Sequence, residues 1–212
     1  MNDYAEICIY MGHKGGPDAQ LEELIKSCLK KLATAITPLY VTTLLPCEVS
    51  DDRVQIDTLE IESKLLARHL FGCTQAYVFA ATLGAAVDRL IAQRAKIDSA
   101  EALCLQACAA AEVENYCNRI ERELSGKAEK RKLFLRPRFS PGYGDFDIAH
   151  QTGLLRVLEA HKRIGLSETK THMLTPLKSV TAIIGAGESI MENAKTEKCA
   201  ACDKTDCAYQ ER

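Results

Sequence analysis

The sequence has no long apolar run, and no segment approaches the roughly 18 consecutive apolar residues that a membrane-spanning helix requires. A recognisable signal peptide is also lacking, because the start, Met1–Glu6, is acidic and the apolar run after it covers only about five residues. We therefore expect a cytoplasmic protein whose ten cysteines are mostly reduced thiols or metal ligands rather than disulfides. Tryptophan is absent too, and its absence excludes no function.

The chain carries little net charge, −2 over 212 residues, which argues against general nucleic-acid binding. It contains no Gly-x-Ser-x-Gly, Gly-x-Gly-x-x-Gly or His-Glu-x-x-His pattern, so hydrolase, dinucleotide-enzyme and zinc-protease functions lack their residues. One basic run stands out, which is either a solvated face or a docking surface for an acidic partner such as an electron-donor protein. Its members are Lys127, Lys130, Arg131, Lys132, Arg136 and Arg138.

Apolar residues make up 47% of the chain and charged residues 26%, the balance of an ordinary soluble globular protein with material for a core. No internal repeat or low-complexity linker divides it. From Lys198 onward the composition changes to polar, charged and cysteine-rich residues. We therefore expect one α/β domain over residues 1–197 and a short cysteine-rich tail over residues 198–212.

Hydrophobic periodicity gives an alternation of helices and strands. The clearest element is a helix over residues 99–125, with one continuous apolar stripe, a capping-box pattern at Asp98 and Glu101, and Gly126 just past its end. The other expected helices cover residues 18–33, 58–71, 85–95 and 148–164, and the expected strands cover 5–11, 38–49, 53–56, 76–81, 132–135, 173–177 and 179–185. The strand at 76–81 is of the kind buried on both faces.

The strongest signal for a binding site lies in the loop between the expected helices over residues 99–125 and 148–164. There Pro141 and Gly142 force a turn between Arg138 and Tyr143. A guanidinium can hold a carboxylate through two hydrogen bonds, and a tyrosine ring can cover an apolar or aromatic moiety. Taken alone, the same residues also describe a tight turn beside a surface arginine.

Other polar residues leave two interpretations open. Glu112 and Glu114 belong either to a solvated helix face or to a cleft where one of them accepts from an amine or a ribose. The Thr82–Gly84 segment is a plain strand-to-helix turn or a ligand-facing edge. For Asp88 and His150 a solvated or structural role is the favoured interpretation.

The tail contains a Cys-x2-Cys pair, Cys199 and Cys202, followed by Cys207. These thiols predict an iron–sulfur or zinc site, with redox thiols or an inert tail as alternatives. Three cysteines leave a tetrahedral site one ligand short, which Cys8, Cys47, Cys73, a histidine, a substrate or solvent could supply. Cys104, Cys108 and Cys117 on the long helix, and Cys28, are expected to pack as small core residues.

The segment Arg138–Tyr143 resembles the Arg-x-x-x-Gly-Tyr signature of the reactivation domain of cobalamin-dependent methionine synthase. Residues 10–15, 79–88, 143–145 and 175–185, and the cysteine-bearing end, are similar in the same order to the stand-alone members of that family. The methionine synthase form commonly has proline after the Gly-Tyr pair, whereas Gly144 stands here, as in the stand-alone relatives.

The resemblance implies an α/β (α+β) domain with a mixed or antiparallel sheet and packed helices, which binds S-adenosylmethionine. By motif, Arg138 would hold the methionine carboxylate. The turn would contact the nucleoside part, and the expected contacts with the cofactor are made by Ser140, Pro141, Gly142, Tyr143 and Gly144. The family's N-terminal acidic ligand is not assigned, since Asp3, Asp18 and Asp51 are equally eligible.

In that family the domain enables reductive methylation of cob(II)alamin, as part of methionine biosynthesis. This chain has no Asp-x-His-x-x-Gly cobalamin-ligating motif, so it would act in trans. The implied partners are a cobalamin-binding methionine synthase or another corrinoid methyltransferase, and a flavodoxin- or ferredoxin-like electron donor. The alternative function is a metal- or iron–sulfur-bearing redox protein that passes electrons to a corrinoid partner.

Overall fold

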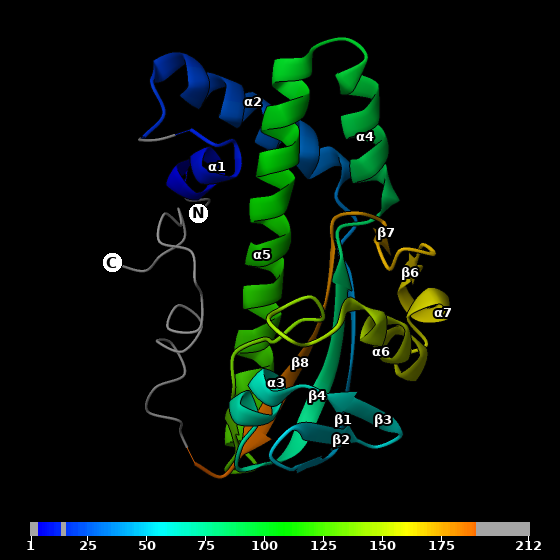
Figure 1. Cartoon of the computed structure of the whole chain (residues 1–212). Coiled ribbons are helices and arrows are strands. Elements are labelled where there is room, and N and C mark those ends of the chain that lie inside the picture. The colour runs from blue at the N-terminus through cyan, green and yellow to red at the C-terminus, as the bar shows by residue number, and fades with distance from the viewer. Residues whose placement is uncertain (1–3, 14–15, 190–212) are drawn as a thin grey trace.

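The computed structural model describes residues 4–13 and 16–189, and its centre is a six-stranded sheet in the order β3-β2-β1-β4-β8-β5 (Figure 1). Every neighbouring pair in this sheet is antiparallel. The strands are β1 (Leu39–Val49), β2 (Arg53–Ile56), β3 (Leu59–Glu62), β4 (Cys73–Thr82), β5 (Phe134–Leu135) and β8 (Ser179–Gly187), and a separate hairpin pairs β6 (Ser167–Glu168) with β7 (Leu174–Thr175). The helices are α1 (Tyr4–Tyr10), α2 (Ala19–Ala35), α3 (Lys64–His69), α4 (Ala85–Ala95), α5 (Ser99–Glu129), α6 (Gln151–Val157) and α7 (Ala160–Ile164), with a 3-10 turn η1 (Ile148–His150) before α6.

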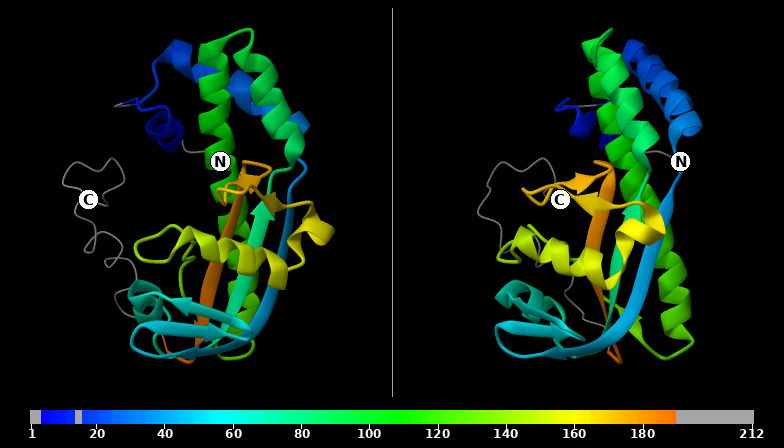
Figure 2. Two further views of the ribbon diagram at one scale, coloured as in Figure 1. Left: turned by 45° about the vertical axis from the view of Figure 1, so that its right-hand side comes forward. Right: turned by 90° about the vertical axis from the view of Figure 1, so that its right-hand side faces the viewer.

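Helices cover both faces of the sheet, as the two views of Figure 2 show. Tyr77 and Phe79 of β4 pack in the core formed with α1, α2, α4 and α5. The alternating Val78 and Ala80 pack in the core formed with α3, α6 and α7. Because each face of the sheet has its own core, successive residues of β4 from Ala76 to Ala81 are all apolar. The prediction of a strand buried on both faces is therefore confirmed.

The long helix α5 lies along one face of the sheet and extends beyond it (Figure 1). Asp98 caps its start, since the side-chain Oδ1 accepts from the amides of Ala100 and Glu101 at 2.9 and 3.0 Å. The helix is longer than predicted, and Gly126 lies inside it rather than past its end. The apolar stripe continues to Ala128, whose burial outweighs the unfavourable helix propensity of one exposed glycine.

Two expected elements are wrong. The expected strand over residues 5–11 lies in the helix α1 (Tyr4–Tyr10) and the turn after it. Ile7 and Cys8 both pack into the core next to α5, and an apolar run this short shows neither a helix nor a strand period. The expected helix over 58–71 contains strand β3, in which only Ile61 is buried between exposed glutamates. The side chain of Ser63 then accepts from the amide of Leu66 and starts α3.

The expected helix over 148–164 is interrupted at Glu159, which has a left-handed backbone (φ 48°), and it ends at Gly165 as predicted (φ 66°). The expected α/β fold with an antiparallel sheet and packed helices is confirmed. Within residues 4–13 and 16–189, none of the helices has both the length and the apolar character needed to cross a bilayer.

Candidate functional site

The loop that carries the sequence signature is attached to the edge of the sheet. After β5 the chain continues along β8, where the amide of Arg136 donates to the Gly185 carbonyl at 2.8 Å and Phe139 exchanges both hydrogen bonds with Ile183 at 2.9 Å. Between the pairs Leu135–Ala186 and Phe139–Ile183 the loop has one more residue than β8. This extra residue makes a bulge at residues 136–138, and such bulges re-aim side chains.

Arg138 lies in this bulge and extends to α5. Its Nη2 lies 3.0 Å from Glu114 Oε2 and donates to Asn118 Oδ1 at 2.8 Å, and its Nη1 lies 2.8 Å from Glu121 Oε2. The three α5 residues are spaced by four and three positions, so they share one face of the helix. The Arg138 side chain is 15% exposed and its Nη1 is buried, so its cation is held between the loop and α5 with little access to solvent.

The turn after Arg138 places Tyr143 near Glu114 and Arg138. Gly142 has φ 91°, which favours glycine, and its amide donates to the Phe146 carbonyl at 2.7 Å. The Tyr143 ring is 50% exposed and meets the Phe139 ring edge-on, with centroids 5.9 Å apart. Partial burial raises the pKa of Tyr143, and the neighbouring Glu114 carboxylate raises this pKa further.

Gly144 and Asp145 fix the end of the turn against α3. Gly144 has φ 54°, and a Cβ on it would overlap the Cδ1 of Leu65. Asp145 accepts from the Ser63 hydroxyl and from the Lys64 amide, the latter at 2.8 Å, and so caps α3 from outside that helix. Desolvation raises the pKa of Asp145, but the hydrogen bonds from Ser63 and the two amides outweigh it, and the pKa lies below its ordinary value.

The basic run around this loop does not form one surface. Arg136 is only 4% exposed, and its guanidinium donates to the carbonyl oxygens of Ser189 at 2.9 Å and Phe71 at 3.4 Å. Arg138 is paired with α5, as described above. The cations that remain exposed at the end of α5 are Lys127, Lys130, Arg131 and Lys132. The expectation of six solvated or docking cations is therefore wrong for two of them.

The turn at Thr82–Gly84 has its polar groups satisfied within the protein. The Thr82 hydroxyl accepts from the Gly84 amide at 3.1 Å and from the Ser179 hydroxyl at 2.8 Å. Asp88 Oδ2 accepts from the Leu177 amide at 2.7 Å. Both contacts join the start of α4 to the segment before β8, which favours the interpretation as a strand-to-helix turn.

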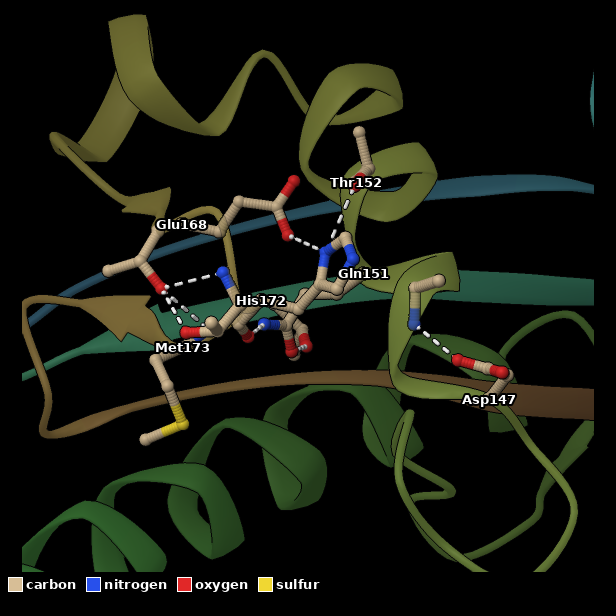
Figure 3. Close-up of polar contacts among 10 residues, drawn as sticks. Asp147, Gln151, Thr152, Glu168, His172 and Met173 are labelled. Atoms are coloured by element: carbon tan, nitrogen blue, oxygen red, sulfur yellow. Dashed lines mark hydrogen bonds and ion pairs between the residues drawn. The ribbon is translucent and has the colours of Figure 1, made fainter.

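A second polar cluster, not singled out by the sequence, joins the loop's continuation to the β6–β7 hairpin (Figure 3). The buried Gln151 donates to the His172 carbonyl and accepts from the Thr181 hydroxyl at 2.9 Å. His172 Nδ1 lies 3.0 Å from Glu168 Oε2 and 3.5 Å from the Thr152 hydroxyl. The cluster thus ties the start of α6 to the hairpin and to β8. His150, just before it, stacks at a tilt on Phe146, with centroids 5.6 Å apart.

The cysteines that the structure describes are all free and buried, namely Cys8, Cys28, Cys47, Cys73, Cys104, Cys108 and Cys117. Burial raises the pKa of Cys47 and of Cys117 to about 12. Within residues 4–13 and 16–189, no group of three or more His, Cys, Asp or Glu side chains is arranged to hold a metal ion. Cys199, Cys202 and Cys207 lie outside the described residues, so the metal site in the tail stays a prediction.

The architecture is that of an α/β domain with one antiparallel sheet between two layers of helices. Within this class the chain is similar to a solved structure described as "Crystal Structure of the MetH Reactivation Domain bound to AdoHcy", with a TM-score of 0.70. The similarity covers 91% of this chain and 76% of that chain at 16% sequence identity, which establishes the fold. No protein-family model and no curated protein matches the sequence. The resemblance seen in the sequence is therefore confirmed as a shared fold.

Proposed function

We propose that the Arg138 loop binds S-adenosylmethionine, and that the protein supports reductive methylation of cob(II)alamin on a separate methionine synthase or other corrinoid methyltransferase. The observation that carries this proposal is the position of Arg138, between a Gly-Tyr turn and the carboxylates of α5. It is supported by the similarity of the fold to a MetH reactivation domain bound to AdoHcy.

The side chains present fit the chemical groups of this ligand. Its amino-acid end carries a carboxylate and an ammonium group, which match the guanidinium of Arg138 and the carboxylate of Glu114. Its adenine ring matches the half-exposed ring of Tyr143. The remaining loop residues, Ser140, Pro141, Gly142 and Gly144, shape the turn that would lie against the nucleoside.

Bound S-adenosylmethionine would supply an activated methyl group, and the residues of this chain would bind and orient it. No side chain is required as a general acid or base in this scheme, because positioning of the donor supplies the protein's contribution. The exposed basic end of α5, with Lys130 and Arg131, supports docking of an acidic electron donor of the flavodoxin or ferredoxin kind.

Calorimetric titration tests the binding step. S-adenosylmethionine should bind the wild-type chain, and Arg138→Ala should weaken binding by about 1.5–3 kcal/mol, the range for hydrogen bonds to a charged group. Arg131→Ala is the matched control, because Arg131 is an exposed arginine of the same basic run, and its substitution should leave affinity unchanged. Equal affinity of wild type and Arg138→Ala would refute the site.

The reactivation step needs its own experiment. A corrinoid methyltransferase brought to the cob(II)alamin state should recover activity when this protein, S-adenosylmethionine and an electron donor are added together. Omitting S-adenosylmethionine, or replacing the protein by Arg138→Ala, should abolish the recovery. Absence of recovery with all components present would exclude that methyltransferase as the partner acting in trans.

A further inference from the structure

Arg136 is a buried cation with one hydrogen-bond donor left unused. The residue is 4% exposed, and its Nη1 and Nη2 donate to the carbonyl oxygens of Ser189 and Phe71. Its Nε is buried and has no hydrogen-bond partner among the residues that the structure describes. None of the ion pairs found in that part of the chain involves Arg136. Because a buried charge is costly unless it is paired, this cation favours an anion beside it.

The thiol of Cys73 lies beside this cation. The side chains of Cys73 and Arg136 meet over Gly185, where an added Cβ would lie 2.7 Å from Cys73 Sγ and 3.1 Å from Arg136 Cγ. Burial raises the pKa of Cys73, and the Arg136 guanidinium opposes this shift. A guanidinium beside a sulfur atom stabilises the thiolate and any other anion that forms on that sulfur.

Cys47 is a comparison thiol in the same core. Cys47 and Cys73 both pack in the core with α3, α6 and α7, and each is 5% exposed. Burial, and to a smaller extent the nearby Cys73 and Glu48, raises the pKa of Cys47 to about 12. The other described cysteines are 0% exposed, namely Cys8, Cys28, Cys104, Cys108 and Cys117. Among the seven cysteines that the structure describes, Cys73 therefore combines contact with the surface and a neighbouring cation.

We propose that Cys73 is a modification site for hydroperoxides, and that Arg136 pairs with the anionic sulfur before and after the reaction. The inference does not depend on the proposed function, because neither residue is expected to contact S-adenosylmethionine. It gives a chemical role to the buried cation that its two hydrogen bonds to carbonyl oxygens do not explain.

The reaction is a two-electron oxidation of sulfur. The Cys73 thiolate attacks one oxygen of the hydroperoxide, so that a sulfur–oxygen bond forms and the oxygen–oxygen bond breaks. The electron pair of the broken bond leaves with the other oxygen, which takes up a proton and departs as water or an alcohol. The sulfenic acid that results can lose its proton to give a sulfenate, and the Arg136 cation is then paired.

The first test compares the nucleophilicity of the two thiols. Native full-length protein is treated with iodoacetamide, with EDTA present so that no metal ion protects a thiol, and alkylation at each cysteine is followed by mass spectrometry. Cys73 should react at least about threefold faster than Cys47, because a stabilised thiolate gains more in population than it loses in intrinsic nucleophilicity. Opening of the shared core would expose both thiols alike, so equal rates would overturn the inference.

The second test uses the proposed reagent. Hydrogen peroxide is added to the Cys47→Ser variant together with dimedone, which traps sulfenic acids, and the substitution prevents a disulfide between the two neighbouring cysteines. We expect the dimedone adduct at Cys73 and not at Cys117. Cys117 is the matched control, because it also lies near an arginine, Arg138, but is 0% exposed, and that cation is already paired with two carboxylates. Absence of the adduct from Cys73 would refute the site.

Variants of Arg136 assign the reactivity to its charge. Arg136→Lys keeps a cation and should retain the alkylation ratio of Cys73 to Cys47, whereas Arg136→Gln removes the charge and should bring this ratio close to one. Arg131→Gln is the matched control, because Arg131 is exposed, and its ratio should equal that of the wild type. An unchanged ratio in folded Arg136→Gln would contradict the role of the cation. If neither variant of Arg136 folds, the wild-type ratio and the dimedone adduct decide.

Discussion

Arg136 and Arg138 are separated by one proline, yet the protein uses the two guanidinium groups in opposite ways. Arg136 is 4% exposed and donates to the backbone carbonyls of Phe71 and Ser189, two segments far apart in sequence. Within residues 4–13 and 16–189, none of the ion pairs with a carboxylate involves Arg136. Arg138 faces two partly exposed carboxylates of one helix. The two arginines therefore differ in which polar groups lose a partner when the cation is removed: backbone carbonyl oxygens for Arg136 and carboxylates for Arg138.

Removing Arg136 leaves the partly buried carbonyl oxygens of Phe71 and Ser189 without this donor, and it leaves a cavity where the buried arginine side chain packed, and both are costly. Removing Arg138 leaves two carboxylates on side chains that are 37% and 26% exposed, which costs less. Thus the buried arginine should determine stability, and the half-buried one should determine binding. The two substitutions should therefore have separable effects.

The largest effect is expected for Arg136→Ala. Loss of the two hydrogen bonds and of the packed side chain should lower the free energy of unfolding by about 3 kcal/mol, measured by urea denaturation. Arg131→Ala removes an exposed arginine of the same run and should change that free energy by less than about 0.5 kcal/mol. If Arg136→Ala costs no more than this control, the contrast between the two arginines is wrong.

Gly144→Ala extends the comparison to the turn that follows Arg138. Alanine must adopt a left-handed backbone there and displace Leu65, so we expect a loss of about 2 kcal/mol in the free energy of unfolding. Gly126→Ala is the opposite control: it lies in an exposed turn of α5 with open space around it and should stabilise the protein by about 0.5–1 kcal/mol. A stabilising effect of Gly144→Ala would show that the turn adopts another conformation in solution.

Asp145→Asn tests the attachment of this turn to α3 and should depend on pH. Because the folded pKa of Asp145 is lowered, its carboxylate contributes stability above its ordinary pKa, and this contribution is lost as pH falls through the lowered value. At neutral pH the variant should lose about 1 kcal/mol, as for other helix caps. The difference from wild type, measured by denaturation from neutral pH downward, should begin to shrink below the ordinary carboxyl pKa of about 3.9 and should vanish only below the lowered pKa. A difference that is independent of pH would contradict the capping role.

The sequence predicted the long elements and failed on short ones. The strands β1, β4 and β8 and the helix α5 have enough residues for a period to be visible. The seven residues of α1 and the four of β3 do not, and their structure depends on which neighbours they contact. The alternation of Leu59, Glu60, Ile61 and Glu62 is typical of a strand. The helix pattern of the residues that follow favoured one continuous helix instead.

The candidate site could be predicted in part. The sequence predicted a site at Arg138, Gly142 and Tyr143, because an arginine and turn-forming residues lie close together there. Of the carboxylates on α5, Glu114 was one of two alternatives that the sequence left open, and nothing in the sequence indicated Glu121. Periodicity places residues on one face of a helix, but it does not indicate which segment that face contacts. The burial of Arg136 depends on the pairing of the loop with β8, which no local pattern indicated.

Arg138→Ala should have the smallest effect on stability and completes the comparison. The side chains of its partners Glu114 and Glu121 are partly exposed, so the free energy of unfolding should fall by only about 0.5 kcal/mol, and less at high salt. Added S-adenosylmethionine at about 100 times its dissociation constant should stabilise the wild type by about 2.7 kcal/mol, whereas the same concentration should stabilise Arg138→Ala far less. Arg136→Ala should behave in the opposite way, with a lower starting stability but a gain on adding ligand close to that of the wild type. A large loss of stability in Arg138→Ala without ligand would mean that its ion pairs hold the loop on α5, and that weaker binding by this variant could follow from a displaced loop.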